Sequence, residues 1–234
     1  MIRAIAFDLD NVLVWMAESH YITLNQALMD VVGFEISYKE HMRYYNGLPT
    51  KIKLKMLNEF GYVDPSQNEQ IYNLKQQYLI RLIDKFMKPD EVKIALHRKL
   101  QEQKYRICCV TNAIRETATK MLEKTGQLLA IEFIISNEDT NHPKPSPDCY
   151  LLASEKFGIP TTDILVVEDT EKGQQAGYDA GCAVFKVKSP ADVTWPAIQQ
   201  IISIVDEIDR KCKDEQRQKD IKSGKYYYSN RRTE

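Results

Sequence analysis

Short apolar segments that alternate with helical patterns constrain the fold of this chain more than any other feature. Five mostly apolar segments have the length and composition of buried parallel strands: residues 3–9, 106–111, 133–136, 164–168 and 183–187. Helical patterns with recognisable ends lie between them, at residues 90–103, 115–125, 146–158 and 171–180. Strands that alternate with helices predict an α/β fold, in which a Rossmann-like parallel sheet has helices on both of its faces.

One long stretch interrupts this alternation. After the first predicted strand, helical periodicity recurs at residues 21–32, 50–60 and 69–87, with no convincing strand among them. A plain loop of that length is improbable inside a compact domain. We therefore expect an inserted helical cap domain at residues 14–88, and a core formed by residues 1–13 and 89–209.

The C-terminal part of the sequence changes in character. After a last helix expected at residues 197–211, the chain becomes polar and shows no pattern. Residues 210–234 contain nine basic and four acidic side chains, whereas the whole chain has a net charge of −1. A segment of this kind cannot supply a core element, so we expect a flexible charged tail at 210–234.

Composition excludes several classes of protein. With 43% hydrophobic and 28% charged residues, this chain of 234 residues is neither collagen-like nor wholly disordered. The chain is close to neutral overall and so lacks the excess of basic residues that is typical of a nucleic-acid binder. It also has no run of about 18 apolar residues, which would indicate a membrane span.

The start of the chain does not resemble a signal peptide, and the five cysteines show no CxxC spacing. We expect reduced thiols, a cytoplasmic location and, slightly favoured among oligomeric states, a monomer.

Polar residues follow the predicted strands at the points where they end. The residues are Asp8 and Asp10 after the first, Thr111 and Asn112 after the second, Lys144 in the loop after the third, and Glu168 and Asp169 after the fourth. In an open α/β sheet the ligand crevice lies at the carboxyl ends of the strands, so these groups should converge. Four acids and one lysine together indicate a metal ion and a phosphate group.

Each residue alone has a simpler interpretation. An Asp-x-Asp pair is usually two surface acids, and a lone lysine such as Lys144 is usually solvated. Thr111 could cap the helix that follows it, and the acids at 168–169 could stabilise the N-terminus of the next helix. The ordered set, with each member at a strand end or in the following loop, favours the functional interpretation.

Four motifs together resemble those of the haloacid dehalogenase superfamily, in particular its helical-capped branch that includes β-phosphoglucomutase and many sugar-phosphate phosphatases. The motifs are FDLDNVL at residues 7–13, VTNA at 110–113, HPKPSPDCY at 142–150 and VVEDTEKGQQAGYDAG at 166–181. The resemblance extends over about residues 1–190, and the combination of motifs is highly specific.

The resemblance implies a catalytic role for each aspartate of the first motif. Asp8 would be the nucleophile that attacks phosphorus and becomes an aspartyl phosphate. Asp10 would protonate the leaving oxygen and then take a proton from the attacking water. The presence of Asp10 favours phosphate esters over dehalogenation, in which no leaving alkoxide needs a proton.

The resemblance also implies a metal ion and a set of phosphate ligands. A Mg²⁺ ion would be held by Asp8, the carbonyl of Asp10 and Asp169, with Glu168 assisting directly or through metal-bound water. The phosphoryl oxygens would be held by four further groups, the side chains of Lys144 and Thr111 and the backbone amides of Leu9 and Asn112.

The sequence departs from the family pattern at several positions. Asn11 stands where glycine is usual, and because Asn is the best substitute in a left-handed conformation, we expect the turn to survive. In the cap, His20 and Lys75 match residues that engage substrate in the mutase, although a lone histidine on a cap helix more often serves packing. Trp15 and Met16 replace a polar pair, and near Thr50 an expected arginine is absent, with Lys51 nearby.

The leading hypothesis is therefore a Mg²⁺-dependent phosphatase that acts on a small phosphorylated metabolite, with sugar phosphates favoured. The alternative among enzymes is a phosphomutase similar to β-phosphoglucomutase, which would keep water away from the aspartyl phosphate. A non-catalytic phosphate-binding protein is a minor alternative, since both Asp8 and Asp10 are present.

Overall fold

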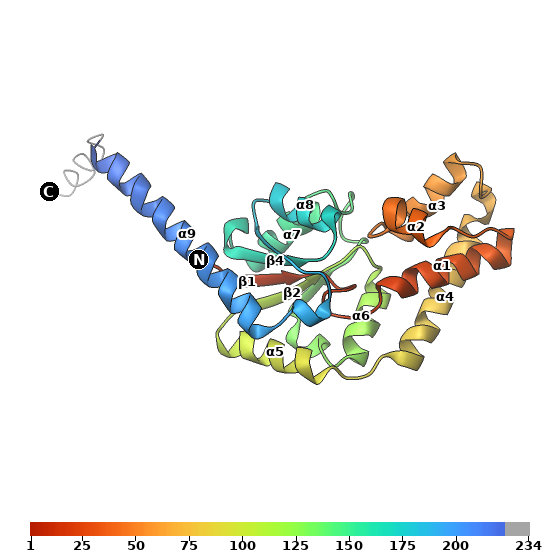
Figure 1. Cartoon of the computed structure of the whole chain (residues 1–234), viewed down its shortest axis with the longest axis horizontal. Coiled ribbons are helices and arrows are strands. Elements are labelled where there is room, and N and C mark those ends of the chain that lie inside the picture. Colours follow the sequence, from red (N-terminus) through yellow and green to blue (C-terminus); the bar gives the residue numbers. More distant parts are fainter. Residues whose placement is uncertain (223–234) are drawn as a thin grey trace.

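A five-stranded parallel sheet forms the centre of the molecule, in a computed structural model that describes residues 1–222 (Figure 1). The strands lie in the order β3-β2-β1-β4-β5, and their bounds are β1 (Ala4–Phe7), β2 (Arg106–Val110), β3 (Phe133–Ile135), β4 (Ile164–Glu168) and β5 (Ala183–Lys186). Each strand lies within the segment predicted for it. The predicted α/β fold with a Rossmann-like parallel sheet is confirmed.

Helices cover both faces of the sheet because successive strand residues point in opposite directions. In β1, Ile5 and Phe7 pack into one apolar cluster and Ala4 and Ala6 into another. The first cluster is covered by α5 (Glu91–Glu102), α6 (Arg115–Lys124) and α9 (Trp195–Lys222). The second is covered by α7 (Asp148–Phe157) and α8 (Glu171–Asp179), on the opposite side of the sheet in Figure 1.

A group of helices between β1 and α5 forms the cap. Its helices are α1 (Ala17–Val32), α2 (Tyr38–Glu40), α3 (Thr50–Glu59) and α4 (Asn68–Phe86). They enclose an apolar cluster of their own, which includes Leu24, Leu28, Leu57 and Ile71. The three long helices lie where the sequence predicted helices, whereas α2 and the π-helical turn that continues it at His41–Tyr45 were not predicted, because such short elements carry little periodicity.

The cap lies against the core at the end of the sheet where the strands finish (Figure 1). Ile83 of α4 packs into the core cluster below the sheet. The Asp84 carboxylate forms ion pairs of 2.8 and 3.0 Å with Lys120 and Lys124 of α6. Above the sheet end, the Asn112 side chain donates a 2.7 Å hydrogen bond to the carbonyl of Gly47 in the cap. The structure therefore has the cap closed over the carboxyl ends of the strands.

The last helix differs from the prediction. α9 begins at Trp195 and continues to Lys222, beyond the predicted end at residue 211. Charged pairs at helical spacing, such as Lys211 with Glu207 and Lys213 with Asp209, support a helix that needs no buried face. The expectation of an unpatterned tail is thus wrong for residues 210–222, and the rest of that tail lies outside the described residues. Within residues 1–222, no helix has the length and hydropathy needed to cross a membrane.

Candidate active site

A tight turn after β1 places Asp8 and Asp10 at the carboxyl end of the sheet. The carbonyl oxygen of Leu9 accepts hydrogen bonds from the backbone N–H groups of residues 12–14, which folds the chain back on itself. Asn11 adopts a φ of 60° in this turn, in the left-handed region that asparagine tolerates better than most residues. The expectation that Asn11 preserves the turn is confirmed.

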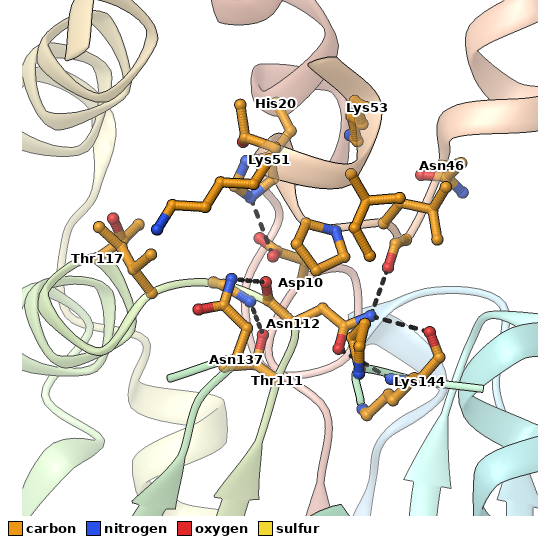
Figure 2. A pocket seen from close by; sticks show the side chains of 18 of the residues that line it. Asp10, His20, Asn46, Lys51, Lys53, Thr111, Asn112, Thr117, Asn137 and Lys144 are labelled. Atoms are coloured by element: carbon orange, nitrogen blue, oxygen red, sulfur yellow. Dashed lines mark hydrogen bonds and ion pairs between the residues drawn. The ribbon is translucent and has the colours of Figure 1, made fainter. Parts of the chain in front are cut away.

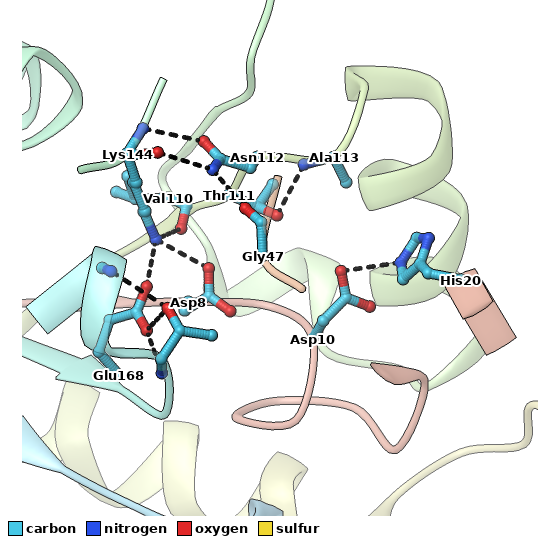
Figure 3. Close-up of polar contacts among 12 residues, drawn as sticks. Asp8, Asp10, His20, Gly47, Val110, Thr111, Asn112, Ala113, Lys144 and Glu168 are labelled. Atoms are coloured by element: carbon cyan, nitrogen blue, oxygen red, sulfur yellow. Dashed lines mark hydrogen bonds and ion pairs between the residues drawn. The ribbon is translucent and has the colours of Figure 1, made fainter. Parts of the chain in front are cut away.

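The Lys144 ammonium joins three strands at the centre of the site (Figure 3). It donates hydrogen bonds to Asp8 Oδ1 at 2.8 Å, to Glu168 Oε1 at 2.7 Å and to the Val110 carbonyl at 2.8 Å. Burial lowers the pKa of Lys144, but the two carboxylates outweigh this effect and hold its pKa well above the usual range. For Asp8, burial raises the pKa well above its usual value, although the neighbouring Lys144 ammonium lowers it in part. The second oxygen of Asp8, Oδ2, has no partner among the described residues.

Glu168 is held in place by the first turn of α8. Its Oε2 accepts hydrogen bonds from the backbone N–H of Thr170 at 2.9 Å and from the Thr170 hydroxyl at 3.0 Å. Gly173 lies so close to this carboxylate that a Cβ at that position would overlap it. Both oxygens of Glu168 are thus occupied, one by Lys144 and the other by Thr170, and glycine is required at position 173.

Three acids offer a place for a metal ion. Oxygens of Asp8, Glu168 and Asp169 lie within 4.8 Å of one another, and one buried oxygen of Asp169, Oδ1, has no hydrogen-bond partner in the described part of the chain. Burial raises the pKa of Asp169 to about 6, whereas a 3.0 Å hydrogen bond from the Asn11 side chain opposes this rise. Three carboxylates around one lysine ammonium leave an excess of negative charge. Such a donor set fits a hard divalent cation such as Mg²⁺.

Asp10 belongs to a different polar chain, which connects the core to the cap. Lys75 Nζ lies 3.2 Å from Nδ1 of His20, and Nε2 of His20 lies 3.0 Å from Oδ2 of Asp10. An ammonium is only a donor, so Nδ1 accepts and the proton of a neutral His20 lies on Nε2, which donates to Asp10. Burial lowers the pKa of His20, consistent with this neutral form. The remaining oxygen of Asp10, Oδ1, is buried and has no hydrogen-bond partner within residues 1–222.

The chain after β2 brings Thr111 and Asn112 to the same place. The Thr111 hydroxyl accepts a 3.0 Å hydrogen bond from the backbone N–H of Ala113, so it is not the cap of α6, which begins at Arg115. No described residue accepts a hydrogen bond from the backbone N–H of Leu9 or of Asn112. Asn112 lines the cavity between the core and the cap, and Leu9 does not.

A cavity of about 380 Å³ unites these groups between core and cap (Figure 2). The core contributes Asp8, Asp10, Thr111, Asn112, Lys144, Glu168 and Asp169, and the cap contributes His20, Lys51, Lys53 and Lys75. Every side chain predicted for the site therefore lines one cavity, including the two cap residues His20 and Lys75. The convergence follows from the parallel topology, which brings all the strand ends to one edge.

Sequence reasoning missed three features of the site. It assigned Asn11 a backbone role only and did not foresee the bond to Asp169, which is distant in sequence. It also missed the contact of Gly173 with Glu168. The third is Lys53, which is buried in the cavity wall. The sequence held one indication of this position: Lys53 lies four residues before Leu57, so both side chains lie on the same face of the predicted helix.

Comparisons with known proteins agree with this arrangement. Hexitol phosphatase A of Escherichia coli (strain K12) is 39% identical over 69 residues, which is 30% of this chain and 32% of that protein. A phosphoglycolate phosphatase of Thiobacillus denitrificans is 26% identical over 191 residues, covering 80% of this chain and 83% of that protein.

A solved structure and a family profile extend the comparison. The crystal structure of β-phosphoglucomutase from Clostridium difficile superimposes with a TM-score of 0.76 at 20% identity, covering 89% of this chain and 99% of that chain, and so has the same fold. The profile of the haloacid dehalogenase-like hydrolases matches residues 5–187, which include the cap helices and all of the sheet except Ala4, the first residue of β1. The chain belongs to the haloacid dehalogenase-like hydrolase family.

Proposed function

We propose that this protein is a Mg²⁺-dependent phosphatase that hydrolyses a small phosphorylated metabolite through an aspartyl phosphate on Asp8. The observation that carries the proposal is the pair formed by Asp8 and Asp10. Each carboxylate belongs to the wall of the same cavity, has one oxygen held by a cationic or histidine partner, and has no hydrogen-bond partner at its other oxygen among the described residues. Two carboxylates in different environments suit two different roles in one reaction.

Asp8 is placed to act as the nucleophile. Lys144 fixes Oδ1, which leaves Oδ2 to attack phosphorus and form a new P–O bond while the bond to the leaving oxygen breaks. The Lys144 ammonium and the Thr111 hydroxyl would hold the oxygens of the phosphoryl group, together with the backbone N–H groups of Leu9 and Asn112. The Thr111 hydroxyl accepts from Ala113 and therefore keeps its own hydrogen for this purpose.

Asp10 is placed to carry the proton. Burial raises the pKa of Asp10, but His20 and the nearby lysines outweigh this and leave its pKa below the usual value. In the free protein Asp10 is thus a carboxylate, the form that takes a proton from water. A phosphate ester bound beside it would raise its pKa, because a nearby negative charge disfavours ionisation. His20 and Lys75 hold the Asp10 carboxylate at the wall of the cavity, where it would protonate the leaving oxygen.

Magnesium would be held by Asp8, Asp169 and the carbonyl of Asp10, with Glu168 supporting the site through its bond to Lys144. The ion would neutralise the negative charges of the carboxylates and the phosphate, which otherwise repel each other. The unpartnered Oδ1 of Asp169 and the excess of acids over lysine support this assignment.

The size of the cavity and the comparisons support a small substrate. A volume of about 380 Å³ is at the low end of the range for small-molecule sites, about 300–1,000 Å³. The relatives named for hexitol phosphate and phosphoglycolate chemistry act on small phosphate monoesters, and sugar phosphates remain the favoured class.

A second candidate is a phosphomutase, favoured by one observation. His20 and Lys75 both reach the site, and the closed cap covers Asp8 and Asp10, as exclusion of water from an aspartyl phosphate requires. A mutase would return the phosphoryl group to another hydroxyl of the sugar instead of releasing it to water.

A panel of phosphorylated metabolites tests both candidates. We expect inorganic phosphate to be released in stoichiometric amount from at least one sugar phosphate, only when Mg²⁺ is present. The Asp8→Asn variant should show less than a tenth of that rate. An isomeric sugar phosphate formed faster than phosphate would favour the mutase, and release that needs no Mg²⁺ would contradict the metal assignment.

A further inference from the structure

Lys53 of the cap is a largely buried lysine whose ammonium has no hydrogen-bond or ion-pair partner among the described residues. Its side chain extends from α3 into the wall of the cavity, and its residue is only 5% exposed (Figure 2). Within residues 1–222 it forms no hydrogen bond or ion pair, whereas the equally buried Lys75 and Lys144 are both bonded. Its Nζ is not one of the fully enclosed polar atoms, so the ammonium faces the cavity although most of the side chain is buried. A cation that faces a cavity without a protein partner is placed to bind an anionic group that enters the cavity.

The charges around Lys53 reinforce this conclusion. Burial and the neighbouring ammonium of Lys75 lower the pKa of Lys53 to about 7, and Lys172 acts in the same sense. Asp10 is the acid that raises it, but Asp10 is already bonded to His20. Two lysines and one aspartate leave this side of the cavity with an excess of positive charge. The core side, with the acids around Lys144, has the opposite excess.

We propose that Lys53 binds a second anionic group of the substrate, a carboxylate or a second phosphate, at the cap end of the cavity while the transferred phosphoryl group lies at Asp8. This inference rests on the proposed phosphatase function and narrows its substrate class to phosphate monoesters that carry a further negative charge. The ammonium of Lys53 donates a charge-assisted hydrogen bond to that group and so selects against substrates with a neutral remainder. Lys53 is then the specificity-determining residue of the pocket.

Matched pairs of substrates test the proposal on the full chain with Mg²⁺. Phosphoglycolate is compared with hydroxyethyl phosphate, and propanediol bisphosphate with propanediol monophosphate, so that each pair differs in one remote anionic group. We expect the wild type to prefer the anionic member of at least one pair. Preference in the first pair would identify a carboxylate and in the second a phosphate as the group bound.

The Lys53→Met variant should lose this preference. We expect kcat/KM for the preferred anionic substrate to fall by about ten-fold or more, the effect of losing one hydrogen bond to a charged group. The change should be mostly in KM, and kcat/KM for the neutral member should fall much less than kcat/KM for the anionic member. Lys55→Met is the matched control, since Lys55 lies exposed on the same helix, and it should change neither value.

Stability and binding provide readouts independent of turnover. Because Lys53 is unpaired in the free protein, Lys53→Met should have a melting temperature at or above that of wild type. In an Asp8→Asn background, phosphoglycolate or propanediol bisphosphate should raise the melting temperature more than its neutral partner does, and Lys53→Met should remove the difference.

The outcomes separate this inference from the proposed function. Phosphate release from all four compounds without preference, or an equal loss in Lys53→Met for both members of each pair, would overturn the role of Lys53 and leave the phosphatase standing. Failure of every phosphate ester tested to release phosphate would contradict the phosphatase instead, and the binding comparison would still decide the role of Lys53.

Discussion

Asn11 holds a left-handed backbone and also donates a hydrogen bond to a candidate metal ligand. Its φ of 60° keeps the turn that places Asp8 and Asp10, and its side chain donates to Asp169 Oδ2 at 3.0 Å and to the Lys188 carbonyl at 3.0 Å. Glycine, which the family pattern favours here, could supply only the first of these. Asn11 therefore adds to this site a contact that orients the Asp169 carboxylate.

Two substitutions separate the backbone role of Asn11 from the role of its side chain. Asn11→Gly keeps the backbone conformation, so we expect a melting temperature near that of wild type. Loss of the bond to Asp169 should raise the Mg²⁺ concentration for half-maximal activity by about ten-fold. Asn11→Ala should show the same Mg²⁺ shift and in addition lose about 1–2 kcal/mol of stability, because alanine is strained at positive φ.

Mg²⁺ titration of phosphate release and thermal unfolding measure these effects. Asn141→Ala serves as control, since Asn141 lines the cavity but bonds to none of the acids. An unchanged Mg²⁺ titration in Asn11→Gly would show that the bond to Asp169 does not orient a metal ligand.

The sequence predicted the location of residues whose position depends only on the order of the strands and on local turns. Asp8, Lys144 and Asp169 converge because each follows a strand of one parallel sheet, and strand ends meet at one edge. The left-handed backbone of Asn11 was predictable for a similar reason, since it depends on a local turn. The bond from Asn11 to Asp169 and the isolation of Lys53 depend on distances between segments far apart in sequence, which no local pattern specifies.

At the scale of elements, the start of α8 supports the centre of the site. Thr170 caps the helix by accepting a 3.1 Å hydrogen bond from the N–H of Gly173, and its own N–H and hydroxyl donate to Glu168. Because Gly173 has no Cβ, the Glu168 carboxylate can lie directly against the helix and reach Lys144.

The Gly173→Ala variant should disrupt this support. The added Cβ would displace the Glu168 carboxylate, and the buried Lys144 would lose one of its two acidic partners. We expect a loss of stability of about 3–5 kcal/mol, as for a broken buried ion pair, and at least a ten-fold loss of activity. Denaturant unfolding measures the first and phosphate release the second.

Gln175→Ala, at an exposed position of the same helix, is the control and should change stability by less than about 0.5 kcal/mol. If Gly173→Ala were as stable as the wild type, the Glu168 carboxylate could adopt another position without loss of stability, and its proposed support of Lys144 would be wrong.

The elements themselves were predictable where they are long and amphipathic. The strands, the core helices and the three long cap helices match their predicted positions, because periodicity over ten or so residues is a strong signal. The continuation of α9 to Lys222 was missed because its second half has no apolar face and is supported by charged pairs instead.

At the scale of the whole molecule, opposite charges lie on the two sides of one cavity. The core side has more acids than lysines, and the cap side has more lysines than acids. If the acidic side binds Mg²⁺ as proposed, the stability of the protein should depend on both pH and Mg²⁺. Burial raises the pKa of Asp169 to about 6, so without metal the folded protein binds a proton that the unfolded chain has released.

The sign of the pH dependence follows from linkage. Between the unfolded pKa of about 4 and the folded value of about 6, the metal-free protein should lose stability as pH rises, and the loss ends above the folded pKa. The proposed Mg²⁺ ion would bind the carboxylate form of Asp169, so its stabilising effect should be small at low pH and grow as pH rises through about 6.

Thermal unfolding with and without Mg²⁺ across this range measures the difference in melting temperature. In Asp169→Asn, which cannot titrate, the Mg²⁺ effect should be weak at every pH. A Mg²⁺ effect of equal size above and below pH 6 would contradict the role of Asp169 as a metal ligand.

Trapping of the aspartyl phosphate tests the central claim most directly. In Asp10→Asn, p-nitrophenyl phosphate should still phosphorylate Asp8, because nitrophenolate leaves without needing a proton, whereas water should be activated slowly. With Mg²⁺ present, acid quenching and mass spectrometry should then find one phosphoryl group on the peptide that contains Asp8. The Asp8→Asn protein should carry none. Phosphate release without any adduct in Asp10→Asn, or an adduct on a different residue, would contradict the account.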